Sequence, residues 1–155
     1  MTRILFVCHG NICRSVMAEY MLDHLIRENG WESFLSCDSA ATSLEEIGNP
    51  IHYGARRCLL RHGIPIGDHR ARRITKDDYG RYDWIIGMDE ENMYDLAWFY
   101  RPDPKEKIAS LLSFAGRSRE IADPWYTGQF EDTYRDLEEG LDGLIDHLKK
   151  QGTLP

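Results

Sequence analysis

The chain has 155 residues, an ordinary globular composition and a net charge of −7, which argues against nonspecific binding to nucleic acid or to anionic membranes. At about 150 residues per domain, this length predicts a single domain over residues 1–155. We see no apolar run near the ~20 residues of a membrane helix and no signal-peptide core, so we expect no membrane insertion and a cytoplasmic location.

In the first half of the chain, strand and helix patterns alternate. An apolar, β-favouring run predicts a strand over residues 3–7, and a polar loop follows over residues 8–14. From Ser15 apolar residues recur on one helical face until Gly30, a plausible C-terminal cap. Residues 34–39 read as a second strand. A helix is expected over residues 50–62, between Pro50 and Gly63.

The second half continues the alternation. Thr75 and Asp78 resemble a capping box for a short helical turn. A third strand is predicted over residues 82–88, a helix over 89–98, and mainly a fourth strand over 107–114. Apolar spacings of three and four predict a C-terminal helix over residues 130–148. The order predicts an α/β fold: a single-domain parallel four-stranded sheet with helices on both faces.

The loop after the first strand carries the most informative residues. Ligands of such sheets bind beyond the carboxyl ends of the strands, and a strand-to-helix loop offers free N–H groups that attract an anion. Gly10 and Asn11 tolerate positive φ, which lets the loop curl. Thiols at helix N-termini or beside arginine ionise readily, so we expect Cys8 to be a thiolate nucleophile. Arg14 supplies a planar fork for two phosphate oxygens.

A phosphocysteine mechanism also needs a general acid for the leaving oxygen. Asp123 is a candidate, because it lies between the last predicted strand and the last helix and precedes Pro124. Proline biases the residue before it to an extended conformation. Trp125 and Tyr126 are candidates for the wall of an aromatic substrate site.

The four cysteines show no spacing typical of zinc sites. We therefore predict free thiols in a reducing cytosol and no metal site. Cys37 and Cys58 are expected to fill space in the core.

These motifs resemble the low-molecular-weight protein tyrosine phosphatase family over nearly the whole chain. The specific match is Cys-x-Gly-Asn-Ile-Cys-Arg-Ser after an apolar strand. Further matches are Ser39-Ala40-Ala41-Thr42, Gly48-Asn49-Pro50, His62-Gly63-Ile64-Pro65, His69-x-Ala71-Arg72-x-Ile74, Met88-Asp89 and Asp123-Pro124. The resemblance implies hydrolysis of phosphotyrosine and small aryl phosphates, without metal or organic cofactor.

The resemblance also implies a role for individual residues. Cys8 is the nucleophile, Arg14 binds phosphate and the transition state, and Asp123 is the acid and later the base. Ser15 steadies the thiolate, and Ser39 and His69 support the shape of the loop. In the family, Cys13 can form a reversible disulfide with the nucleophile. The full expected phosphate-binding set is His9, Gly10, Asn11, Ile12, Cys13 and Arg14.

Two positions depart from the family pattern. Val16 stands where proline is usual, which we expect to cost a little stability and no chemistry. Glu45 stands at or near an aromatic wall position of the eukaryotic members. A carboxylate cannot stack on a phosphotyrosine ring, so we expect weaker aromatic selectivity or a preference for basic neighbours. The expected substrate wall is Leu44, Glu45, Trp125 and Tyr126.

Three alternative functions remain open. Related arginine phosphatases carry threonine where this chain has Ile12, and thioredoxin-coupled arsenate reductases need further cysteines where none follows Cys58. A noncatalytic phosphate-binding module is expected to lack Cys8 or Asp123. The expected partners are a phosphotyrosine-containing protein as substrate and inorganic phosphate as product, with the chain a monomer or weak homodimer.

Overall fold

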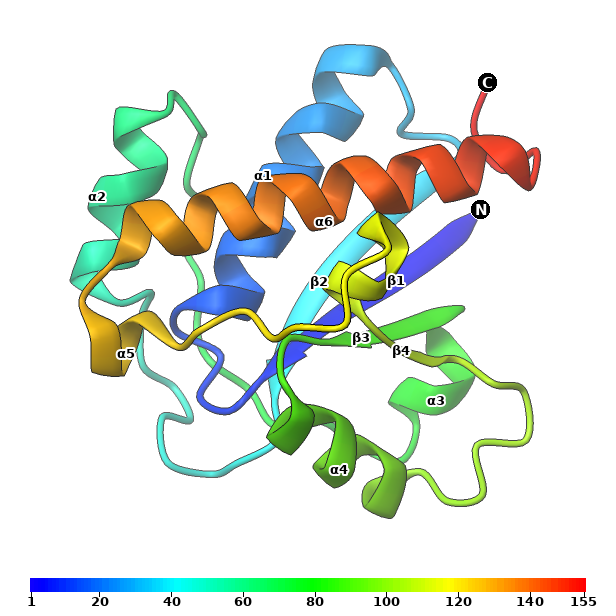
Figure 1. Ribbon diagram of the computed structural model, residues 1–155, viewed down its shortest axis with the longest axis horizontal. Coiled ribbons are helices and arrows are strands. Elements are labelled where there is room, and N and C mark those ends of the chain that lie inside the picture. The colour runs from blue at the N-terminus through cyan, green and yellow to red at the C-terminus, as the bar shows by residue number, and fades with distance from the viewer.

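The computed structural model describes residues 1–155 and contains one sheet of four parallel strands (Figure 1). Their spatial order is β2-β1-β3-β4, and each neighbouring pair is parallel. This confirms the predicted four-stranded α/β fold. The strand bounds are β1 Thr2–Cys8, β2 Leu35–Ala41, β3 Trp84–Gly87 and β4 Ile108–Ser110.

Helices cover both faces of the sheet, as predicted (Figure 1). Their bounds are α1 Arg14–Asn29, α2 Tyr53–Arg61, α3 Asp78–Arg81, α4 Glu90–Phe99, α5 Pro124–Thr127 and α6 Phe130–Lys150, with a 3-10 helix η1 at Leu111–Ala115. The long helix α6 crosses in front of α1, and α4 lies against the opposite side of the sheet (Figure 1). No helix is long and apolar enough to cross a membrane.

The alternation of side chains along β1 explains the two layers. Ile4 and Phe6 point into the larger core cluster, which also holds apolar residues of α1, α2 and α6. Leu5 and Val7 point into a second cluster with Leu96 of α4. All four side chains are fully buried, because successive residues of a strand face opposite sides and both sides are covered. The strand therefore ends, at Cys8, inside the protein rather than at its surface.

Several predicted element boundaries were wrong. The expected fourth strand over residues 107–114 is a strand only at Ile108–Ser110, and Leu111–Ala115 forms η1 instead. Leu111 packs closely on Gly140 of α6, where a Cβ would lie 2.5 Å from the leucine Cγ. Packing of apolar residues against α6 thus ends the strand early, and the apolar run alone did not distinguish the two structures.

The predicted helix over residues 50–62 begins later, because the His52 side chain caps it by accepting from Gly54 N–H at 2.9 Å. The predicted capping box at Thr75 and Asp78 is present only in part. Asp78 accepts from Thr75 N–H at 2.8 Å, but Asp77 is the N-cap residue of α3. Asp78 is fully buried and pairs with Arg72 at 2.9 Å.

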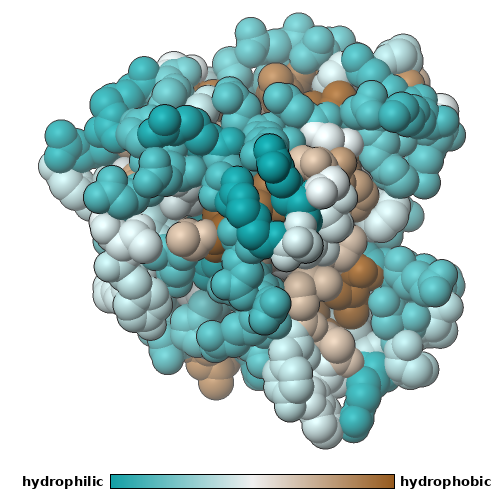
Figure 2. Space-filling model, in the orientation of Figure 1, coloured by the Kyte–Doolittle hydropathy of each residue, from teal (hydrophilic) through white to brown (hydrophobic).

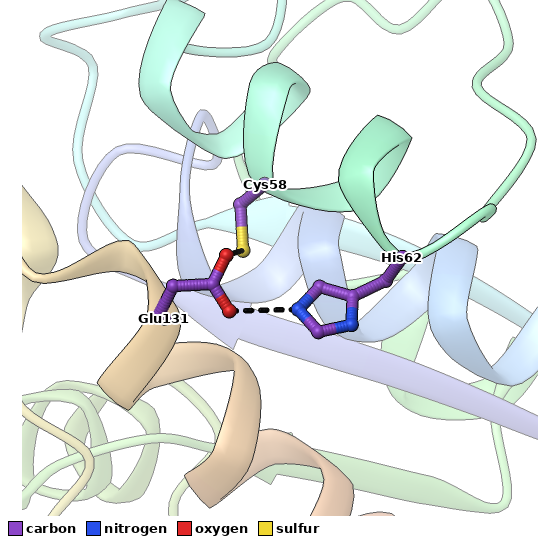
Figure 3. A group of neighbouring side chains, drawn as sticks. All are labelled: Cys58, His62 and Glu131. Atoms are coloured by element: carbon purple, nitrogen blue, oxygen red, sulfur yellow. Dashed lines mark hydrogen bonds and ion pairs between the residues drawn. The ribbon is translucent and has the colours of Figure 1, made fainter.

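Polar contacts of Glu131 connect α6 to α2 and its C-terminal end (Figure 3). Glu131 on α6 accepts from the His62 imidazole at 2.7 Å and from the Arg61 guanidinium at 2.8 Å, and these contacts lower the pKa of its carboxyl to about 2. The Cys58 thiol donates to the same carboxylate at 3.4 Å. Cys58 is fully buried in the larger core, as predicted, but it also has this polar partner.

Candidate active site

The loop between β1 and α1 forms the floor of the site. Its carbonyl groups are bound to the surrounding protein: those of Cys8 and His9 accept from Thr42 N–H and Ser43 N–H at 3.0 and 3.1 Å, and that of Ile12 accepts from His52 N–H at 2.8 Å. The N–H groups of residues 9–13, by contrast, have no hydrogen-bond partner in the protein. A run of unpaired amides, with the carbonyls of Cys8, His9 and Ile12 bound to other segments, is an arrangement that binds an anion.

The N-terminus of α1 adds to the positive potential of this loop. Its N-cap residue is Cys13, which makes no side-chain capping bond, so the first turn of the helix also keeps its N–H groups free. A 16-residue helix carries a partial positive charge at that end. The floor of the site therefore attracts negative charge through both the loop and the helix.

Asn11 holds the loop in shape. It is fully buried, has φ of 60° and donates from Nδ2 to Ser15 Oγ at 2.8 Å and to Ser39 Oγ at 2.9 Å. Its own carbonyl oxygen accepts from His69 Nε2 at 2.6 Å. Left-handed backbone is unfavourable for a residue with a side chain, so these bonds keep Asn11 in a conformation that the isolated chain rarely adopts.

Cys8 lies at the start of this loop with its Sγ 3.1 Å from Ser15 Oγ. Because the Ser15 hydroxyl accepts a hydrogen bond from Asn11, its own proton is free to point at the sulfur. Cys13 is also buried, and desolvation strongly raises the pKa of its thiol. The two loop cysteines thus have different surroundings, and only Cys8 has a hydroxyl donor.

Arg14 is almost completely buried and points its guanidinium at three acceptors. Nη1 donates to Asp89 Oδ2 at 2.7 Å and to the Ile121 carbonyl at 2.9 Å, and Nη2 donates to Asp123 Oδ2 at 3.4 Å. Burial lowers the pKa of Arg14, but Cys8 and Asp89 outweigh it and raise that pKa. Arg14 Nε is buried and has no partner, which leaves one donor for a bound ligand.

Asp123 is the N-cap residue of the short helix α5, and its Oδ1 accepts from Trp125 N–H at 3.0 Å. Pro124 at the first helical position holds the preceding residue in extended backbone, as predicted. With its other oxygen 3.4 Å from Arg14, Asp123 lies next to the anion-binding floor. The structure thus brings together the three predicted catalytic side chains.

The rim of the site is a pocket of about 100 Å³ lined by the loop, by the segment after β2 and by α5. Glu45, Trp125 and Tyr126 line it as predicted, but Leu44 is not among the lining residues. Trp125 is 55% exposed and packs edge-on against His52 with ring centroids 5.4 Å apart. His9 Nε2 lies 3.0 Å from Glu45 Oε2, which ties the acidic segment to the loop.

Three residues that contribute to the active site were not predicted from the sequence. Asp89 orients Arg14, and the aspartate in the matched Met88-Asp89 pair was the available signal. Glu46 lines the pocket one residue beyond the predicted Glu45. Glu19 accepts from Ser39 Oγ–H at 2.6 Å, and burial raises the pKa of its carboxyl to about 7. Nothing in the sequence placed Glu19 beneath the loop.

A larger hollow of about 660 Å³ lies beside Ser39 and His69 and does not contain the site. The thiol in its lining belongs to Cys37, and burial raises the pKa of that thiol well above its usual value. The hollow also lacks the unpaired amides of the loop, so we place the chemistry at Cys8.

Known proteins resemble this chain in sequence and in fold. The sequence profile of low molecular weight phosphotyrosine protein phosphatases matches residues 3–154. The low molecular weight protein-tyrosine-phosphatase YfkJ of Bacillus subtilis is 36% identical over 99% of this chain and 100% of that protein. Its crystal structure superposes with a TM-score of 0.93, over 97% of this chain and 96% of that one.

Two further relatives bear on the function. The human low molecular weight phosphotyrosine protein phosphatase is 42% identical over 85% of this chain and 86% of that protein. The crystal structure of a Drosophila arginine phosphatase is 31% identical, with a TM-score of 0.87 over 96% of this chain and 97% of that one. The chain belongs to the family of low molecular weight protein-tyrosine phosphatases, which are cysteine-dependent hydrolases of phosphoproteins.

Proposed function

We propose that Cys8, Arg14 and Asp123 carry out the hydrolysis of phosphotyrosine in proteins. The observation that supports this most strongly is the asymmetry of the loop: the carbonyls of Cys8, His9 and Ile12 are bound to other segments of the protein, and the N–H groups at residues 9–13 are free. Together with the unpaired Arg14 Nε, these donors suit the oxygens of a phosphoryl group.

The first step is attack of the Cys8 thiolate on phosphorus. A sulfur–phosphorus bond forms, the bond to the tyrosine oxygen breaks, and Asp123 gives its proton to that oxygen. Arg14, held by Asp89, stabilises the charge that spreads over the transferring oxygens.

The second step is hydrolysis of the phosphocysteine. Asp123, now a carboxylate, takes a proton from water, the water oxygen attacks phosphorus, and the sulfur leaves as a thiolate. Ser15 donates to that sulfur and stabilises it. Inorganic phosphate is released, and the enzyme returns to its starting state.

We infer a phosphotyrosine substrate rather than phosphoarginine from the apolar Ile12 in the pocket lining and from the aromatic residues Trp125 and Tyr126 at its rim. Phosphotyrosine presents an aromatic ring and no cation to this wall. A cytoplasmic location agrees with four unpaired cysteines, because the mechanism needs Cys8 reduced.

The test is hydrolysis of p-nitrophenyl phosphate across pH by the native protein, Cys8→Ser and Asp123→Ala. We expect no turnover in Cys8→Ser and a loss of roughly a hundredfold or more in Asp123→Ala. Because the nitrophenolate leaves easily, a small effect of Asp123→Ala is checked with phosphotyrosine peptides. Full activity in Cys8→Ser would overturn the proposal, and faster turnover of phosphoarginine than of phosphotyrosine would favour the alternative.

We further propose that peroxide drives a disulfide between Cys8 and Cys13, both of which are free thiols here. Peroxide oxidises the Cys8 thiolate to a sulfenic acid, and the Cys13 thiol then displaces water to form the disulfide. Peptide mapping after peroxide treatment should find the Cys8–Cys13 link. Sulfonic acid at Cys8 alone would contradict it.

A further inference from the structure

A chain of hollows leads away from the active-site pocket across the surface. His9 lines both that pocket and a second hollow of about 460 Å³ between the segment after β2 and helix α4. Tyr94 and Trp98 line this second hollow and also a third one of about 620 Å³. We call the second and third hollows together the α4 groove.

The part of the α4 groove nearest the active site is cationic. Arg73 and Lys76 line it, both exposed, and both lie over the Phe99 ring at 5.4 and 4.1 Å from its centroid. Lys76 also donates to the Phe99 carbonyl oxygen, so the ammonium is fixed in place. Asp95 is the one acidic side chain in this lining. A local excess of positive charge on a protein of net charge −7 is a feature that a negatively charged partner would recognise.

The farther part of the groove is aromatic and apolar. Tyr94 is 64% and Trp98 53% exposed, and Trp98 Nε1 donates to the Tyr94 hydroxyl at 2.9 Å. The Arg101 guanidinium lies over the Trp98 ring, 3.8 Å from its centroid. Met93, Ala97 and Ile108 add apolar surface, and Figure 2 shows an apolar band over α4 and β4. Exposed aromatic surface that is held in place is typical of binding sites.

We propose that the α4 groove binds the segment of a substrate polypeptide next to its phosphotyrosine. An acidic side chain of that segment pairs with Arg73 and Lys76, and an apolar side chain farther along packs on Tyr94 and Trp98. The groove adjoins the active-site pocket at His9, which lines both, so the segment next to a phosphotyrosine bound in the loop lies close to the groove. This inference rests on the proposed function and names the class of substrate.

The opposite side of His9 has the reverse charge. His9 Nε2 lies 3.0 Å from Glu45, and Glu46 lines the pocket on that side. Glu91, 4.0 Å from His9 Nδ1, belongs instead to the first turn of α4. Acidic residues of a substrate are therefore repelled on that side and attracted on the side of the α4 groove. We therefore expect acidic residues beside the phosphotyrosine to be favoured where they meet Arg73 and Lys76. At the rim near Glu45, by contrast, basic residues of the substrate are favoured.

The test compares kcat/KM for four phosphotyrosine peptides that differ only in the residues flanking the phosphotyrosine: aspartate and leucine, lysine and leucine, aspartate and alanine, or alanine alone. Both the N-terminal and the C-terminal flank are varied. For the flank that lies in the α4 groove, we expect kcat/KM of the aspartate peptide to exceed that of the lysine peptide by about tenfold, mainly through a lower KM. This preference should shrink as salt rises, because the pairs are exposed.

The variants are Lys76→Glu and Arg73→Glu, with Lys150→Glu as the control. Lys150 is also exposed, undergoes the same charge change and lies at the far end of α6. We expect each groove variant to abolish or invert the aspartate preference, and the control to keep it. Trp98→Ala should remove the gain from leucine. All four variants should hydrolyse p-nitrophenyl phosphate at the native rate, because none lies in the catalytic machinery.

Equal kcat/KM for all peptides, or a preference that both charge reversals leave intact, would overturn the inference. Self-association that Trp98→Ala abolishes, without any peptide preference, would also overturn it and assign the groove to a second copy of the chain. If native p-nitrophenyl phosphate turnover depends on Cys8 while peptide preference is absent, the groove inference fails alone. If the native protein hydrolyses neither reagent, the proposed function fails as well.

Discussion

The loop that binds phosphate and the rim around it are built in opposite ways. Asn11, Ser15 and Ser39 are buried and joined by hydrogen bonds, and the loop carbonyls have partners on three other segments. At the rim, Trp125 and Tyr126 are 55% and 82% exposed, and the carboxylate of Glu45 has one partner, His9.

This difference separates the chemistry from the choice of substrate. A buried, fully bonded network holds one geometry, because each lost hydrogen bond leaves a buried polar group unpaired at a cost of about 1–3 kcal/mol. Exposed side chains with few contacts change at little cost to folding. We therefore expect substitutions in the loop to affect turnover and stability together, and those at the rim to affect KM alone.

The largest effect is expected from Arg14→Lys. Lysine keeps the charge but loses the planar fork that contacts Asp89, the Ile121 carbonyl and a bound phosphoryl group. We predict that kcat falls by about 10²–10³-fold, since a donor to the transition state is lost. Arg117→Lys, on an exposed salt bridge to Glu139, is the matched control and should change nothing. Native kcat in Arg14→Lys would show that the fork is dispensable.

Asn11→Gly and Asn11→Ala separate hydrogen bonding from backbone strain. Both remove the bonds to Ser15 and Ser39, and we expect each to lower the free energy of unfolding by about 1–3 kcal/mol. Alanine should cost about 1 kcal/mol more than glycine, because the backbone φ is 60°. Urea denaturation measures the free energy of unfolding of each variant. Equal stability of the two variants would mean that the loop relaxes out of its left-handed conformation.

Glu19 adds a pH dependence to the buried region. Burial raises the pKa of its carboxyl to about 7, above the ordinary value of 4.5, so the folded state favours the protonated form. Its contribution to stability is therefore fully present below about pH 4.5 and is lost as the pH rises through 7.

Glu19→Gln keeps an acceptor for the Ser39 hydroxyl and removes the charge. We expect the variant to match the native Tm near pH 5 and to exceed it near pH 8. Glu32→Gln, at an exposed position, serves as the control and should show no such difference. A Tm difference that is the same at both pH values would show that Glu19 does not titrate in this range.

The smallest effect is expected at the rim. Glu45→Tyr replaces a carboxylate that repels the phosphate dianion with a ring that stacks on aryl substrates. We predict a KM for aryl phosphates lower by roughly 2–5-fold, with kcat and Tm unchanged, because an aromatic contact is worth about 0.5–1.5 kcal/mol. If KM does not change, the wall is formed by Trp125 instead.

The sequence predicted the parts of the site that are local in the chain. Cys8 to Ser15 are contiguous, and both the anion-binding floor and the residue types of the nucleophile and clamp were visible there. The partners of Arg14 were not, because Asp89 and the Ile121 carbonyl lie 75 and 107 residues away. Only the strand order brings them together.

Prediction of the fold from the sequence had the same limit. The parallel sheet with helices on both faces followed from the alternation of patterns, but the end of the fourth strand did not. Residues 107–114 are apolar enough for a strand, and the contact between Leu111 and Gly140 of α6 decides that residues 111–114 belong to a 3-10 helix. Such a boundary depends on packing between distant elements.

The most direct test of the central claim is to trap the covalent intermediate. Turnover of p-nitrophenyl phosphate is quenched with denaturant within milliseconds, and the peptides are mapped by mass spectrometry. We predict one phosphoryl group per chain on the Cys8 sulfur in the native protein and in Asp123→Ala, and none in Cys8→Ser. A phosphoryl group on another residue, or turnover by Cys8→Ser without any adduct, would contradict the account.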